Sequence, residues 1–101
     1  MATNTRVLFR GAATTTVGTT LYTVPSSTTT IVTNIAVTNT AGTAGTFTIA
    51  LAGTALHTTA AIAANSTAYI DLKQVLATTN VITGGASATS INFHISGIEV
   101  S

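Results

Sequence analysis

The sequence contains no cysteine and no tryptophan, and it has a single proline. Without cysteine, the chain cannot build a disulfide framework, bind zinc through thiolates or use a thiolate nucleophile. Charge is nearly as scarce, since 101 residues include three lysines or arginines and two acidic residues, for a formal net charge of +1. So few cations cannot neutralise many phosphates, and we expect no nucleic-acid partner. No apolar segment approaches the roughly 18 residues that cross a bilayer, and we expect no membrane partner.

Threonine takes the place of charge, with 25 of the 101 residues. Hydrophobic residues make up 46% of the sequence and charged residues 5%, the reverse of the composition that keeps a chain disordered. The length suits one small domain. A nearly neutral surface rich in hydroxyl groups lacks the charge repulsion that keeps free proteins apart, which favours a permanent place in a larger assembly.

Aliphatic residues alternate with small or polar ones along most of the chain, which predicts β-strands. The alternation is clear at residues 31–39 and 46–51, and the small residues 41–45 between them predict a hairpin. Residues 91–96 alternate as well, and we expect a bulge at Gly97. Shorter strands are expected at residues 6–9, 20–24, 67–72 and 80–83, whereas residues 56–59 suit a loop or a strand edge.

Seven or eight short strands predict an all-β fold, an antiparallel β-sandwich with either a jelly-roll or an immunoglobulin-like strand order. Helix is disfavoured because threonine and valine lose side-chain freedom in it. We expect residues 19–101 to form the sandwich domain and residues 1–18 to be an N-terminal arm or its first strand. The predicted core consists of Val24, Ile31, Ile35, Val37, Phe47, Ile49, Leu51, Ile70, Leu72, Leu76, Ile82, Ile91, Phe93 and Ile95.

Few residues could support catalysis or bind a metal. The two carboxylates, Asp71 and Glu99, lie 28 residues apart, and the two histidines, His57 and His94, lie 37 apart. These spacings differ from those of zinc and calcium sites. The sequence also has neither a Gly-x-Ser-x-Gly nucleophile elbow nor a Gly-x-Gly-x-x-Gly nucleotide loop. We therefore predict a protein that is not an enzyme and holds no metal or other cofactor.

Two of the three cationic side chains lie within residues 6–10. Regular strand alternation would place Arg6, Leu8 and Arg10 on one face and Val7 and Phe9 on the other. One interpretation is an arm or edge strand that binds an acidic partner, because arginine can contact a carboxylate through two hydrogen bonds. The other is a first strand that simply faces solvent. Arg6, Leu8 and Arg10 are thus the candidate partner-binding residues.

Several segments in order carry a resemblance to a known family. Residues 21–26 read Leu-Tyr-Thr-Val-Pro-Ser and residues 32–39 read Val-Thr-Asn-Ile-Ala-Val-Thr-Asn. A turn at residues 61–67, the triplet Ile-Asp-Leu at 70–72 and a closing strand at 91–99 follow. Together, residues 20–100 resemble a small β-sandwich family found among virion proteins of tailed bacteriophages. The chain departs from that family at Ala63, where proline is common.

The resemblance implies a phage virion structural protein and favours a capsid decoration (cement) protein that binds the outer surface of the assembled shell. Its partners would be the major capsid protein and further copies of itself, as in a trimer or another homo-oligomer. It would be located in the virion, which assembles in the host cytoplasm. One alternative is a tail, neck or fibre component. Another is a carbohydrate- or cell-surface-binding module, for which Tyr22 and Tyr69 are the candidate aromatic platforms.

Overall fold

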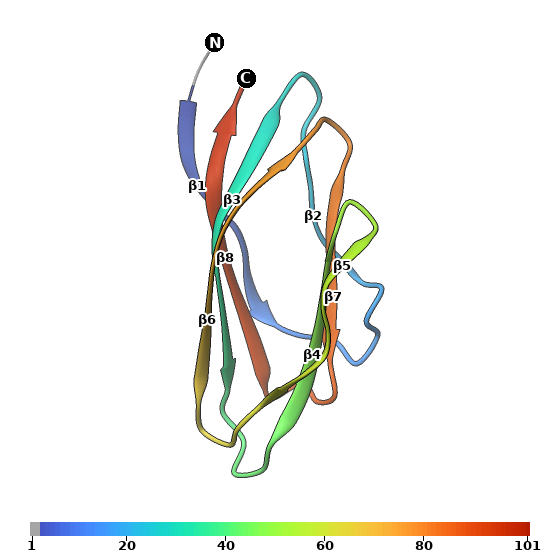
Figure 1. The fold of residues 1–101 in the computed structure, drawn as a ribbon, viewed down its shortest axis with the longest axis vertical. Coiled ribbons are helices and arrows are strands. Elements are labelled where there is room, and N and C mark those ends of the chain that lie inside the picture. Colours follow the sequence, from blue (N-terminus) through green and yellow to red (C-terminus); the bar gives the residue numbers. More distant parts are fainter. Residues whose placement is uncertain (1–2) are drawn as a thin grey trace.

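The computed structural model describes residues 3–101, which form eight β-strands and their connections (Figure 1). The strands are β1 (Thr3–Ala12), β2 (Thr20–Thr23), β3 (Thr29–Asn39), β4 (Gly45–Leu51), β5 (Thr54–Ile62), β6 (Thr67–Leu76), β7 (Val81–Ala86) and β8 (Ile91–Val100). The sequence predicts seven of them. It misses β5 because the apolar residues of this strand do not alternate, and its pairing with β4 is interrupted by two register shifts.

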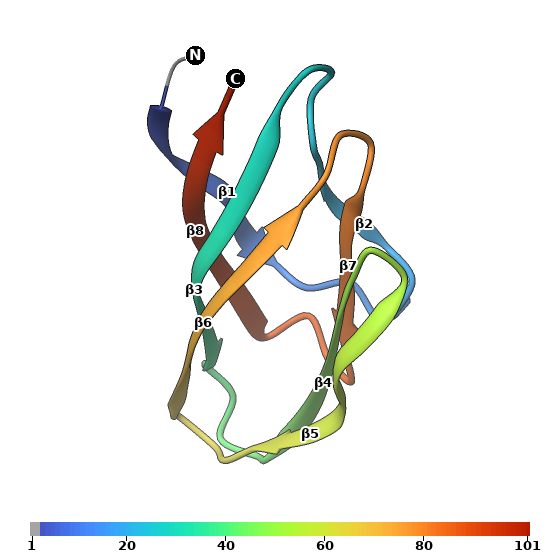
Figure 2. The same cartoon turned by 45° about the horizontal axis from the view of Figure 1, so that its top comes forward.

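The strands form two antiparallel sheets of four, which lie face to face (Figures 1 and 2). Sheet A has the order β1-β8-β3-β6, and sheet B has the order β2-β7-β4-β5. The first strand thus pairs with the last, the second with the seventh, the third with the sixth and the fourth with the fifth. This is the pairing of a long hairpin wrapped around itself, the eight-stranded jelly roll. The predicted all-β sandwich is confirmed, and its strand order is not immunoglobulin-like.

Residues 3–12 of the segment predicted as an arm or first strand form β1, which pairs with β8 along its length. Met1 and Ala2 lie outside the described residues. No helix that could span a membrane occurs among residues 3–101.

The predicted hairpin at residues 41–45 is wrong, because β3 and β4 belong to different sheets. The connection crosses from one sheet to the other and is held by the buried side chain of Asn39. Its Nδ2 donates to the carbonyl of Thr43 at 2.8 Å, and its Oδ1 accepts from the Ala41 N–H at 3.0 Å. Small turn residues suit a crossing between sheets as well as a turn within one.

β4 and β5 form a hairpin between consecutive strands. Ala52 and Gly53 connect them with φ angles of 52° and 79°. Two successive residues of positive φ match the twist of antiparallel strands and produce the tightest hairpin turn.

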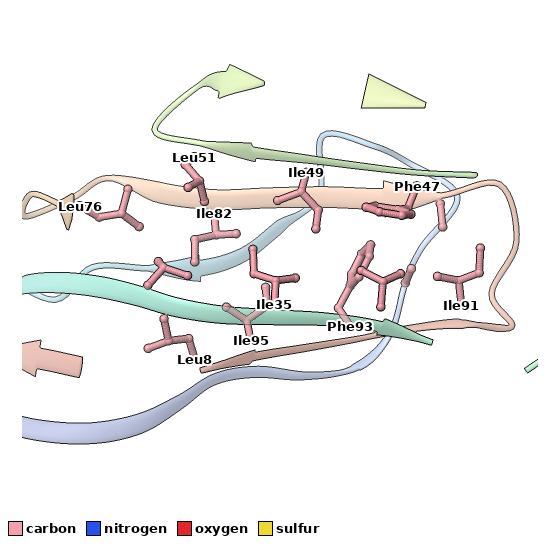
Figure 3. Packing of buried hydrophobic residues seen from close by; sticks show 14 of the residues in the cluster. Leu8, Ile35, Phe47, Ile49, Leu51, Leu76, Ile82, Ile91, Phe93 and Ile95 are labelled. Atoms are coloured by element: carbon pink, nitrogen blue, oxygen red, sulfur yellow. The ribbon is translucent and has the colours of Figure 1, made fainter. Parts of the chain in front are cut away.

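The core fills the space between the two sheets, and Figure 3 shows side chains from both pointing into it. Phe47 of β4 meets Phe93 of β8 edge to face, with ring centroids 6.4 Å apart. Most predicted core residues are buried, while Ile70 and Leu72 pack against the core at its border. The buried apolar residues that the sequence analysis missed are Leu8, Ala13, Val32, Ile62 and Ala86.

Bulges in β1 and β3 explain two of these errors. In β1, Val7 pairs with Ser96 and Phe9 with Ile95, so Leu8 is an extra residue and turns into the core. In β3, Thr33 is the extra residue opposite β8. Val32 is therefore buried, and Ile31, which the sequence places in the core, is only half-buried.

β8 lies between the two bulged strands and alternates without interruption. The bulge predicted at Gly97 is thus found in its neighbours instead. Gly97 points inward, where a Cβ atom would lie 2.9 Å from Leu8 Cδ1 and closer still to the carbonyl oxygen of Ile31. Glycine is required here because the bulged strands approach the β8 backbone closely.

Candidate interaction surface

The candidate partner-binding residues do not share one face. Arg6 pairs with Gly97 on the inner face of sheet A, whereas Arg10 pairs with His94 on the outer face. Leu8 lies in the core with 8% of its surface exposed. The predicted common face is wrong because it assumed an unbroken alternation, which the bulge at Leu8 interrupts. A role of these three residues in partner binding stays a prediction.

Arg6 contacts a buried carboxylate at one end of the sandwich. Its Nε lies 3.3 Å from Oε1 of Glu99, which is 8% exposed. The Tyr22 hydroxyl donates a hydrogen bond to the other carboxylate oxygen and lies 2.8 Å from Thr30 Oγ1. Burial raises the pKa of Tyr22, and the hydrogen bond to Glu99 raises this pKa further. This network could not be predicted from sequence patterns, since its four residues come from four different strands.

The titratable residues considered for catalysis lie apart. His57 is on β5 of sheet B, where its ring lies 5.7 Å from that of Phe47. His94 and Asp71 lie on sheet A, and Asp71 accepts a hydrogen bond of 3.3 Å from Asn34 Nδ2. Among residues 3–101, no three histidine, aspartate or glutamate side chains come together as metal ligands would.

Apolar side chains gather on the outer face of sheet A. Ile98 of β8 pairs with Ile31 of β3, and Ile31 pairs with Val75 of β6, so the three form a row across the sheet. Val7 and Val75 are 50% and 66% exposed. Large contiguous apolar patches are rare on the surfaces of free soluble proteins, and where they occur they often mark interaction sites. The residues of this outer-face patch are Val7, Ile31, Val75, Ile98 and Val100.

A hollow of about 450 Å³ opens next to the outer-face patch. It is lined by Thr5, Arg6, Val7, Thr33, Ser96, Gly97 and Ile98. The bulges of β1 and β3 lie on its two sides. The lining combines apolar groups with the hydroxyl groups of Thr5, Thr33 and Ser96. A partner's side chain can therefore enter the hollow while these hydroxyl groups hydrogen bond to the partner's backbone.

No protein-family model and no curated protein match this chain.

Proposed function

We propose that the protein is a structural component of a bacteriophage virion, a capsid decoration protein that binds the outer surface of the assembled shell. The observation that carries the proposal is the outer-face patch of sheet A and the hollow beside it. The choice of the major capsid protein as partner comes from the resemblance of residues 20–100 to small virion sandwiches.

The chemistry of this face suits a lasting contact with another protein. Its apolar side chains are held on a hydrogen-bonded sheet, so binding would cost little ordering of the backbone. Hydroxyl groups around the hollow can satisfy polar groups of the partner. Arg10 is exposed on β1 of the same face, and in this proposal it would contact an acidic rim of the partner. Several copies placed across joints between shell subunits would add buried area that opposes internal pressure.

Cosedimentation with shells that lack the protein tests the proposal. We expect Val7→Asp to weaken binding, because an aspartate would have to lose its hydration at the contact. Val17→Asp is the matched control, since Val17 is 52% exposed and lies away from this face, in the connection between β1 and β2. Equal binding by the two variants and the unaltered chain would contradict a contact through the outer face of sheet A.

The exposure of Tyr69 favours a second candidate, a carbohydrate-binding module, because this residue of β6 is 75% exposed. Tyr22 is less suited as a platform, since its hydroxyl is engaged with Glu99 and Thr30. Binding of the isolated protein to a glycan array, lost in Tyr69→Ala, would favour this candidate over shell decoration.

A further inference from the structure

We infer that two copies of the chain associate through β6, pairing as antiparallel strands about a two-fold axis at Leu72. β6 is the last strand of sheet A, and within residues 3–101 its backbone pairs with β3 alone (Figures 1 and 2). Its other side presents backbone N–H and C=O groups to which a further strand can hydrogen bond. This inference concerns the free protein and does not depend on the proposed function.

The other three edge strands carry features that oppose such pairing. β2 has only four residues and is soon followed by Pro25. β5 has two register shifts against β4 and a φ of 48° at Thr59, which bend it. β1 contains the bulge at Leu8 and two arginines, so two β1 strands side by side would bring positive charges together. Bulges, proline and like charges are the usual means of blocking a sheet edge.

β6 has ten residues, and its one register shift against β3, at Leu72 and Lys73, leaves the alternation of exposed and half-buried side chains from Thr67 to Lys73 intact. Its exposed side chains suit a second copy of the same strand. In an antiparallel pair about Leu72, Asp71 lies opposite the second copy's Lys73. Tyr69 lies opposite Val75, and these are the two most exposed large hydrophobic side chains in residues 3–101. The two-fold axis repeats each of these two cross-strand contacts, so each occurs twice in the dimer. Opposite charges and aromatic pairs with β-branched residues are the cross-strand contacts that stabilise antiparallel strands.

The same charges select the register. An axis at Asp71 would place the carboxylates of the two Asp71 copies opposite each other. An axis at Lys73 would place the two Lys73 ammonium groups opposite each other. Like charges directly opposite destabilise a strand pair. Leu72, midway between them, is the position at which both charges meet their opposites.

The pairing has a geometric consequence for the outer face. The two-fold axis would stand perpendicular to the joined sheets, so both copies of sheet A would continue as one sheet with their outer faces on the same side. Both outer-face patches could then contact one partner surface at once. Two linked contacts bind more tightly than one without any new side-chain interaction.

Sedimentation equilibrium over a concentration series tests the inference with the full chain at low salt. We expect the mass to rise from 10.1 kDa toward twice that value. Asp71→Lys and Lys73→Asp should each weaken association about tenfold or more, because two symmetry-related pairs change from attraction to repulsion. An equimolar mixture of the two variants should associate again, since each lysine then faces an aspartate. Val17→Asp, at an exposed position in the connection between β1 and β2, is the control and should leave association unchanged.

Amide hydrogen exchange on the unaltered chain adds a test that needs no variant. Protection of amides along β6 should increase with protein concentration, whereas that of β1 should not. A chain that stays monomeric over the whole series would overturn the inference. So would a trimer, a dimer that both single variants leave intact, or a mixture of variants that fails to associate.

Discussion

The hydroxyl of Tyr22 on β2 donates a hydrogen bond to Oε2 of Glu99 on β8, and this contact joins the two sheets. Glu99 is 8% exposed, and its other oxygen faces Arg6. A buried carboxylate needs such partners because it has lost most of its hydration. The network therefore stabilises the end of the sandwich where β1, β2, β3 and β8 meet.

Removing the Tyr22 hydroxyl should destabilise the fold. Tyr22→Phe leaves Glu99 with one fewer partner, and we expect the free energy of unfolding to fall by about 1–3 kcal/mol. Urea denaturation measures this change. Tyr69→Phe removes a hydroxyl from a residue that is 75% exposed and should have almost no effect. Equal effects of the two substitutions would show that the Tyr22–Glu99 contact does not contribute.

The same hydroxyl should make stability depend on alkaline pH. Burial and Glu99 raise the pKa of Tyr22 above its ordinary value of 10.0, so the folded state favours the protonated phenol. Its contribution is fully present below pH 10.0 and is lost as the pH rises through the higher folded-state pKa. Urea unfolding at about pH 9 and about pH 11 should show a loss of stability that Tyr22→Phe reduces. A loss of the same size in both proteins would contradict this assignment.

Gly97 should not tolerate even a methyl group. In Gly97→Ala the new Cβ would lie 2.9 Å from Leu8 Cδ1 and would also press on the backbone of Ile31. Overpacking of this kind costs about 1–3 kcal/mol, which thermal unfolding would detect as a lower Tm. Gly42→Ala is the control, because nothing lies within 4 Å of a Cβ at that position. An unchanged Tm for Gly97→Ala would mean that the bulged strands move aside easily.

Phe93 should be among the residues on which the core depends most. It is fully buried and meets Phe47 across the two sheets. We expect Phe93→Ala to reduce the free energy of unfolding by about 3–5 kcal/mol, since the cavity cannot close completely. Chemical denaturation would test this, with Val17→Ala at an exposed position as the control. A loss below about 1 kcal/mol would indicate that the core rearranges around the cavity.

Much of the fold could be predicted from the sequence because the pattern of β8 is regular. Ile91, Phe93 and Ile95 alternate with polar residues and are all buried. Period-two alternation reports burial directly wherever a strand pairs without interruption. It fails at Leu8 and Thr33, where one extra residue reverses the face of everything that follows.

The pairing of strands that are far apart in the sequence was harder to predict than the strands themselves. Asn39 and the small residues after it look the same whether the chain turns within a sheet or crosses between sheets, and only the pairing of β3 with β6 and β8 decides. The outer-face patch was hidden for the same reason. Ile31 and Val75 are 44 residues apart and become neighbours only through that pairing.

The number of copies in purified virions, measured against the major capsid protein by quantitative mass spectrometry, tests the central claim most directly. A decoration protein bound across the shell should be present in hundreds of copies per particle. A count of about 6 to 12, the number expected at a single symmetry axis, would indicate a tail or neck component and contradict shell decoration. Absence from the particles would contradict a virion role altogether.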